Sequence, residues 1–305
     1  MMRKIKRLLL NENGNILVTV ALFMAVLLGA TGLAVDVGKV YLEKSELQKA
    51  LDAAVLGGAH IIVGKGEAEA ITLAKTIAQK NKYSLEGSPF STTRNSIKVT
   101  KQVTVPMTFA KFIGVEDKVV SASAKAIAAP LKIGTGITPI AVEKAAIPHG
   151  TELKCDNTGN HHGNCGYLAI DGSGASNLAD GILNGASVSV GDMKTFDTDP
   201  GQKWGPVKSA FQTLIDRDED KPHCQRFDTA DNHCARVIYI VVIDTWDNLN
   251  GKDQVQVVGL AAYWLEDVNK DKSIKGRFIK TIAPGEIDLT SGGSEYSLYG
   301  VKLVE

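Results

Sequence analysis

Four cysteines in the second half of the chain are the residues best suited to chemistry. They are Cys155, Cys165, Cys224 and Cys234, so that the members of each neighbouring pair lie ten positions apart. In an exported protein, an even set of cysteines more often forms disulfides than a redox or metal site. The disulfides Cys155–Cys165 and Cys224–Cys234 would close two short loops, and each would stabilise the fold by roughly 2.5–3 kcal/mol through loop-closure entropy. The connectivity stays open, because four cysteines allow three pairings.

Histidines near these cysteines raise the alternative of a zinc site. Two cysteines and two histidines can bind zinc tetrahedrally, and the histidines in this region are His161, His162, His223 and His233. The sequence lacks the C-x₂-C and H-x₃-H spacings of common zinc motifs, and thiols outside the cytoplasm tend to oxidise. We therefore expect structural disulfides, with no metal and no cofactor, and keep zinc as the alternative.

Three polar loops carry oxygen donors at suggestive spacings. Residues 216–220 and 267–273 alternate acidic or amide side chains with other residues, as calcium loops do. In the second loop Lys272 and Phe278 occupy the EF-hand positions for the turn glycine and the bidentate glutamate. Residues 171–175 resemble the D-x-S-x-S adhesion motif, but Ala175 lacks its hydroxyl. We expect solvated turns at 216–220 and 267–273 and a glycine-rich turn at 171–175.

Enzyme signatures are missing from the sequence. It contains no G-x-S-x-G, H-E-x-x-H or G-x-x-x-x-G-K-[ST] pattern, and we expect no catalytic residue and no enzyme activity. Lysine plus arginine and aspartate plus glutamate both total 34. This balance gives no electrostatic reason to expect a nucleic-acid partner.

Residues 16–35 form an uncharged apolar segment, and its placement decides where the rest of the chain lies. About 20 helical residues at about 1.5 Å each span a bilayer core of about 30 Å. Basic residues precede the segment, namely Arg3, Lys4, Lys6 and Arg7. The positive-inside rule keeps that side cytoplasmic. We expect a single-pass protein of the cell membrane with a cytoplasmic tail (1–15), a transmembrane anchor (16–35) and the rest outside the cytoplasm.

The same segment shows features that bear on its fate and on its packing. It is longer than a signal-peptide core and has only a weak cleavage site at residues 32–34, which favours a retained anchor over a cleaved signal. Small residues recur along one face, at Ala21, Ala25, Gly29 and Gly32. Such a face allows close approach of a second membrane helix.

Helical periodicity continues beyond the apolar segment. Apolar residues recur at three and four positions from Val37 to Val55, which predicts one helix running out of the bilayer. A second helix is predicted at 67–81, strands at 97–105 and 120–128, and a helical turn at 107–113. Alanines along one face of the second strand suit close packing of a helix. We expect the long helix to lie on a small antiparallel sheet within residues 36–130.

Residues 12–130 resemble the TadG-like N-terminal part of Flp (tight adherence) pilus-assembly proteins, the TadE/TadG-like family. The similarity is carried by residues 13–15, 34–41 and 47–59, and its motif positions are Asp36, Gly38, Tyr41, Leu47, Gln48, Asp52, Ala53 and Ala54. The resemblance implies a membrane-anchored accessory protein of pilus assembly or surface adherence. Its partners would be the lipid bilayer and other pilus-assembly or cell-surface proteins.

The second half of the chain changes character after a Gly-rich segment at 134–136, which we interpret as a linker. Beyond it, strands are predicted at 167–170, 187–190, 237–243, 254–263 and 277–282, and helices at 176–183 and 207–215. The predicted class is α+β, with a mostly β extracytoplasmic domain at 137–305. Alternative functions are a membrane-anchored surface adhesin unrelated to pili and an exported zinc protein that uses the Cys/His cluster.

Overall fold

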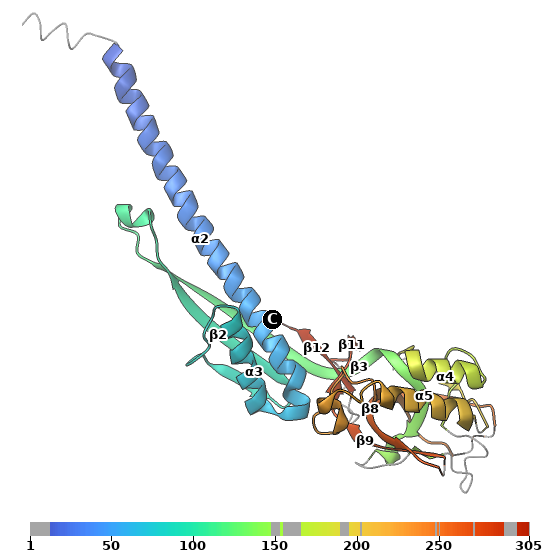
Figure 1. The fold of residues 1–305 in the computed structure, drawn as a ribbon. Helices are drawn as coiled ribbons and strands as arrows, with labels where there is room; N and C mark the ends of the chain where they lie inside the picture. The colour runs from blue at the N-terminus through green and yellow to red at the C-terminus, as the bar shows by residue number, and fades with distance from the viewer. Residues whose placement is uncertain are drawn as a thin grey trace, which may run out of the picture.

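The computed structural model describes residues 13–147, 153–154, 166–189, 195–201, 203–247, 249, 251–270, 272–289 and 298–304. A long helix extends from a small sheet module, and a larger sheet domain lies at the far end from the N-terminus (Figure 1). This arrangement confirms the predicted α+β class, with a long apolar N-terminal helix followed by a mostly β domain.

The helix α2 (Asn13–Lys65) runs for 53 residues without a break. Residues 16–31 are exposed along their whole length, and this helix is long and apolar enough to cross a membrane. Buried side chains recur from Leu47 onward, where the helix lies on the small module. The predicted continuity of anchor and amphipathic helix is therefore confirmed. Gly66, with a φ of 96°, separates α2 from α3 (Glu67–Lys80).

The small module is an antiparallel sheet covered by the two helices, and the hairpin of its two long strands reaches farthest toward the N-terminal part of α2 (Figure 1). The strands β1 (Phe90–Thr93), β2 (Ser96–Val105) and β3 (Lys118–Glu143) pair antiparallel, and β2 pairs with β3 from Ser96↔Ile127 to Val105↔Lys118. The 3₁₀ turn η1 (Ala110–Ile113) forms the tip of this hairpin. The predicted alanine face lies under α2 and is buried, with Ala122, Ala124, Ala126 and Ala128 at most 5% exposed.

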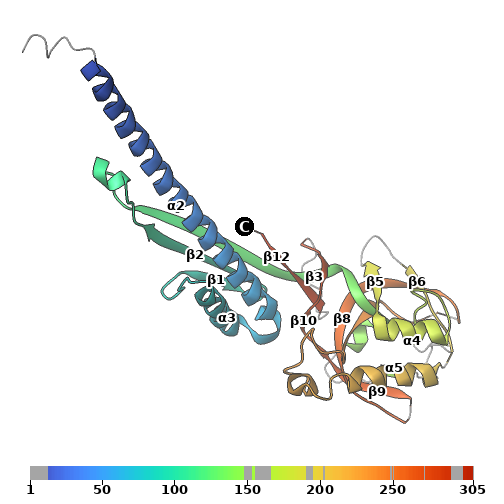
Figure 2. The same ribbon diagram turned by 45° about the horizontal axis from the view of Figure 1, so that its top comes forward.

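The strand β3 continues into the distal domain and connects the two parts. There it pairs parallel with β7 (Val237–Ile243), which is followed by the antiparallel strands β8 (Gln254–Val268) and β9 (Ser273–Ile279). The helices α4 (Ala175–Asn184) and α5 (Trp204–Asp216) pack together over one face of this sheet (Figure 2). Phe211 of α5 and Ile240 of β7 are fully buried in the core between them.

Short elements complete the described chain. They are β4 (Leu153–Lys154), β5 (Ala186–Ser189), β6 (Thr195–Asp197), β10 (Thr281–Ile282), β11 (Gly285–Ile287), β12 (Leu298–Leu303) and the 3₁₀ turns η2 (Lys144–Ala146) and η3 (Pro222–Gln225). The strand β12 pairs antiparallel with residues 126–130 of β3. The end of the chain therefore returns to the module next to the anchor.

Two predictions about the second half are wrong. Residues 134–136 are not a linker but part of β3, where Gly136 has a φ of 73° and the pairing register shifts. Glycine there allows an irregularity within a strand rather than a separation of domains. Tyr167 and Leu168 form isolated bridges instead of the strand predicted at 167–170.

Candidate functional site

Asp36 lies where the apolar segment ends, and its carboxylate holds the hairpin tip against the helix. Its Oδ1 accepts a hydrogen bond from the backbone N–H of Thr108 at 3.0 Å. Its Oδ2 accepts from the N–H groups of Phe109 and Ala110 at 2.8 and 2.7 Å. These donors belong to the N-terminus of η1, which has no side-chain cap of its own. Asp36 thus caps the turn from a distant part of the chain.

Further polar contacts fix the same tip. Lys39 donates from Nζ to the carbonyl of Pro106 at 3.0 Å. Asp117 accepts from the Met107 N–H at 3.0 Å and pairs with Lys111 at 2.8 Å. Gly114 then ends the turn in the left-handed conformation, with a φ of 79°. The tip is consequently held in one conformation relative to the helix.

The pKa of Asp36 lies below its usual value, chiefly because the Ala110 N–H donates to the ionised carboxylate. Burial acts in the opposite direction, and the Thr108 and Phe109 N–H groups and the charge of Lys39 lower the pKa further. The ionised form is therefore the one that the tip recognises.

Gly32 contacts the tip from inside the apolar segment. A Cβ atom at this position would lie 2.7 Å from Cγ of Phe109, so only glycine admits the ring there. Ala21, Ala25 and Gly29 are exposed, and a Cβ at Gly29 would meet nothing within 4 Å. The predicted small-residue face therefore has two parts. Gly32 packs on the hairpin, whereas Ala21, Ala25 and Gly29 are exposed.

The remaining motif residues lie on two faces of α2. Leu47 and Ala54 are fully buried against the sheet. Gln48 donates from Nε2 to Asp52 Oδ1 at 2.8 Å and to the Ser123 carbonyl of β3 at 2.9 Å. Asp52 and its neighbour Ala53 are half-buried. This half of the motif therefore serves helix–sheet packing.

Gly38 and Tyr41 have no such packing role. A Cβ at Gly38 would meet nothing within 4 Å, and Tyr41 is 76% exposed. Both lie just beyond Asp36 on the part of α2 that leaves the apolar segment. An exposed tyrosine at that place is available for contact with lipid headgroups or another protein.

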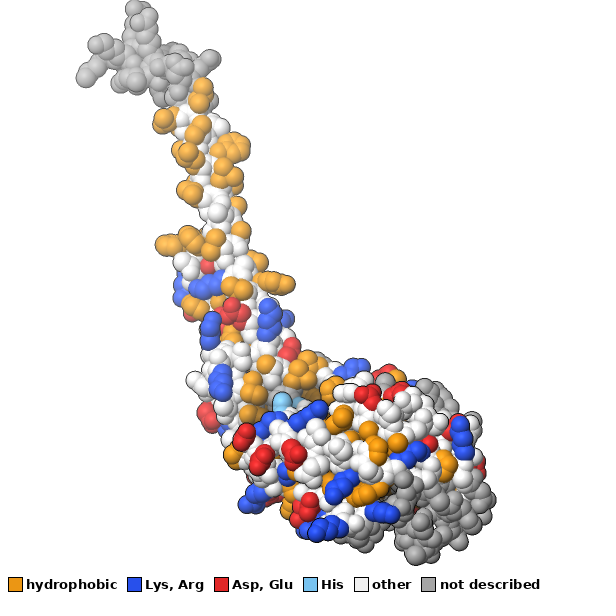
Figure 3. Space-filling model, turned by 45° about the vertical axis from the view of Figure 1, so that its right-hand side comes forward, with side chains coloured by type: hydrophobic (Ala, Val, Ile, Leu, Met, Phe, Trp, Pro, Cys, Tyr) orange, Lys and Arg blue, Asp and Glu red, His pale blue; other side chains and the backbone are white. Residues whose placement is uncertain are grey.

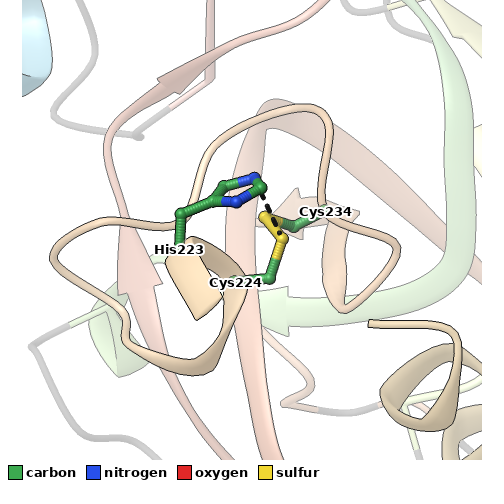
Figure 4. Close-up of side chains that lie close together, drawn as sticks. All are labelled: His223, Cys224 and Cys234. Atoms are coloured by element: carbon green, nitrogen blue, oxygen red, sulfur yellow. Dashed lines mark hydrogen bonds between the residues drawn. A yellow bond between two sulfur atoms is a disulfide. The ribbon is translucent and has the colours of Figure 1, made fainter. Parts of the chain in front are cut away.

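Cys224 and Cys234 form a disulfide with a Cα–Cα distance of 5.5 Å. Figure 4 shows His223 beside it, with Nε2 3.3 Å from the Cys224 sulfur. The carbonyl of Cys224 also accepts a hydrogen bond from Trp264 Nε1 at 2.9 Å. The disulfide therefore closes the loop between α5 and β7, and the hydrogen bond from Trp264 holds this loop against β8.

The bonded sulfurs bear on the zinc alternative. His223, Cys224 and Cys234 place potential ligand atoms within 4.8 Å of one another, but sulfurs joined by a disulfide are not thiolate ligands. His233 is exposed and contacts Asp231. Cys155, Cys165, His161 and His162 lie outside the described residues.

The acidic loop at 216–220 is a largely exposed turn, as expected, except that its central residue is buried. Asp218 is fully buried and accepts from the Arg236 N–H at 2.8 Å and from Lys221 Nζ at 2.6 Å. Burial raises the pKa of Asp218, but Lys221 and the backbone donors outweigh it and leave the pKa lowered. At 267–273, Asn269 donates to Ser273 within the turn between β8 and β9. Asp171 is exposed in a glycine-rich loop before α4.

The sequence reasoning missed the apolar character of the hairpin tip. Phe109, Phe112 and Ile113 are 46%, 88% and 66% exposed. The signal was present in the sequence, since three large apolar residues stand in a turn between two strands. The sequence pattern predicts a helical turn there and no surface role.

Comparison with known proteins finds a family similarity in the same part of α2. Residues 14–60 match the Flp pilus-assembly TadE/G-like family. This range covers the apolar segment, Asp36 and the motif face of α2, and it agrees with the resemblance inferred from the sequence. No curated protein and no solved structure matched the chain.

Proposed function

We propose that this chain is a membrane-anchored accessory protein of Flp-type pilus assembly, which acts by anchoring and by protein contact. The observation that carries the proposal is the family match at 14–60, which coincides with the anchor and with the motif residues around Asp36. The small module and the distal domain would then be held at a fixed distance from the membrane by α2 and β3.

Charge and cysteine chemistry support an orientation with the distal domain outside the cytoplasm. Four basic residues precede the apolar segment and favour a cytoplasmic N-terminus. The Cys224–Cys234 disulfide suits an oxidising compartment. The carboxylate of Asp218, which is buried in the loop after α5, is occupied by Lys221 and by the Arg236 N–H. We propose a role in binding rather than in catalysis.

Tyr41 is the motif residue best placed for contact with a pilus-assembly protein. It is exposed on α2 beyond Asp36, whereas Leu47 and Ala54 are used internally. Its neighbour Leu42 is 58% exposed but lies outside the motif, which makes it a matched control.

Co-purification from membranes tests this proposal. The tagged full chain, solubilised in a mild detergent, should recover other Flp pilus-assembly proteins. Tyr41→Ala should reduce this recovery while the chain stays in the membrane, and Leu42→Ala should not. Failure of the wild-type chain to recover any pilus-assembly protein would contradict the function, and equal recovery by both variants would remove Tyr41 from the contact.

A further inference from the structure

The tip of the β2–β3 hairpin presents an apolar surface that the protein itself does not cover. Phe112 is 88% exposed, Ile113 66% and Phe109 46%, and Val119 at the start of β3 is 61% exposed. Ala110 is the residue of η1 that turns inward, at 4% exposure. We call Phe109, Phe112 and Ile113 the apolar tip.

The position of the apolar tip is fixed relative to the anchor. Asp36 receives three backbone donors from residues 108–110, and Gly32 lies under the ring of Phe109. Gly32 precedes Asp36 by about one helical turn, which is about 6 Å closer to the middle of the apolar segment. Phe109 therefore lies level with residues that belong to the membrane-spanning part of α2.

This level corresponds to the edge of the hydrocarbon core. Residues 16–35 as a helix are about 30 Å long, which matches the thickness of that core. The end of the segment near Asp36 then meets the headgroup region, and the apolar tip lies beside it. Figures 1 and 2 both show the hairpin reaching up along α2 toward the anchor.

The chemistry around the apolar tip fits the membrane interface. In the view of Figure 3, hydrophobic side chains dominate the anchor and charged ones begin where the helix reaches the module. Lys39 and Lys111 are tied to Pro106 and Asp117 at the base of the tip. Aromatic rings at the headgroup level with lysines just outside are typical of membrane interfaces.

We propose that the apolar tip inserts into the lipid interface next to the anchor, as a second point of membrane contact. Lipid is the favoured contact for the apolar tip, because the tip adjoins the apolar segment and lies at the depth of the edge of the hydrocarbon core. Opposite charges are balanced around the tip, with Lys111 and Lys118 against Glu116 and Asp117. Insertion therefore depends on apolar contact and proceeds in zwitterionic membranes.

Tryptophan fluorescence in reconstituted vesicles tests the insertion. The native tryptophans, Trp204, Trp246 and Trp264, all lie in the distal domain, so the wild-type signal can be subtracted. Phe112→Trp in the full chain, reconstituted into phosphatidylcholine, should give a blue-shifted added emission. That added emission should lose intensity when the acyl chains carry bromine near the headgroup. Arg94→Trp, in the turn between β1 and β2, is the control and should stay unquenched.

Two outcomes would overturn the proposal. Added emission from Phe112→Trp that is red-shifted and unaffected by brominated lipid would place the tip in water. Blue-shifted emission that brominated lipid does not quench would place it against protein, either a second copy or a partner. Both results leave the pilus-assembly role untouched, because that role rests on co-purification.

Discussion

Asp36 joins segments of the chain that are 72 to 74 positions apart. At the end of an apolar helix an aspartate can simply mark the exit from the membrane. Here both carboxylate oxygens are used by backbone N–H groups of the hairpin tip. Asp36 is only 2% exposed, although residues 16–31 of the neighbouring apolar segment are all exposed. The residue therefore sets the position of the tip as well as the end of the anchor.

Asp36→Asn should loosen the tip while leaving the rest of the fold intact. An amide has one acceptor oxygen, and its NH₂ group would face backbone donors. We expect faster hydrogen exchange of the amides at 108–113 and unchanged exchange in β7 and β8, measured by mass spectrometry. Glu116→Gln removes an exposed carboxylate from the same tip and is the control. Equal protection in both variants would mean that Asp36 does not hold the tip.

The tip should also lose order in acid. The pKa values of Asp36 and Asp117 are both lowered from 3.8 in the folded chain. Their contribution is therefore fully present above the unfolded pKa and is lost as pH falls through the lower folded values. Exchange protection at 107–113, corrected for the intrinsic rate, should hold from about pH 7 to 5 and fall below about pH 4. Loss of protection on raising the pH instead would contradict this assignment.

Sequence reasoning identified Asp36 as a motif residue but could not assign its contacts. The donors at 108–110 are distant in sequence, and nothing in local spacing indicates that they lie beside residue 36. The same limit applies to Asp218, which pairs with Lys221 and with the backbone of Arg236. An acidic run was expected to be solvated, whereas the fold buries its central member.

The long helix α2 contains two glycines where α3 and β2 approach it closely. A Cβ at Gly58 would lie 2.9 Å from Cδ1 of Ile97 and 3.0 Å from the Ala70 carbonyl oxygen. A Cβ at Gly57 would meet Ile77 Cδ1 at 2.1 Å. These glycines permit tight packing of the helix against its neighbours.

Gly58→Ala should destabilise the small module by about 1–2 kcal/mol, because overpacking outweighs a gain in helix propensity of about 1 kcal/mol. Gly38→Ala is the matched control on the same helix. A Cβ there meets nothing within 4 Å, so we expect stabilisation by about 0.5–1 kcal/mol. Urea denaturation in detergent, followed by circular dichroism, measures both changes. The same sign for both variants would contradict the packing described for Gly58.

The disulfide loop between α5 and β7 should contribute measurably to the distal domain. The bond closes a loop with a sequence separation of 10, which corresponds to about 2.7 kcal/mol of loop-closure entropy. Cys224→Ala with Cys234→Ala should lower the free energy of unfolding of that domain by this order. Urea denaturation followed by tryptophan fluorescence reports on it, because Trp264 donates to the Cys224 carbonyl. His233→Ala, at an exposed neighbouring position, should have no effect.

Elements with strong periodicity were predicted well. The strand predicted at 237–243 matches β7, and the helix predicted at 67–81 matches α3 within one residue. The length of β3 was not predictable, because Pro130 and the glycines at 134 and 136 are signals of interruption. Its pairing with β11, β12 and β5 carries the strand through that region.

The whole molecule is organised around one helix and one strand. The helix α2 carries the anchor and the small module, and β3 leads from that module into the distal sheet (Figure 1). The return of β12 to residues 126–130 of β3 gives the two parts a second connection. The hydrophobic cores on either side of residue 130 are separate. Buried residues up to Ala128 pack in the core of the small module with α2, and those from Leu131 onward pack in the distal domain. The sequence indicated two parts but not the strand that they share.

Topology tests the central claim most directly, namely that residues 16–35 are a retained anchor and that everything after them lies outside the cytoplasm. Alkaline phosphatase, which needs an oxidising compartment, and a reporter active only in the cytoplasm would each be fused after Glu305 of the full chain. The account predicts an active phosphatase fusion that stays in the membrane pellet after alkaline carbonate washing. Activity of the cytoplasmic reporter instead, or release of the phosphatase fusion into the soluble fraction, would contradict it.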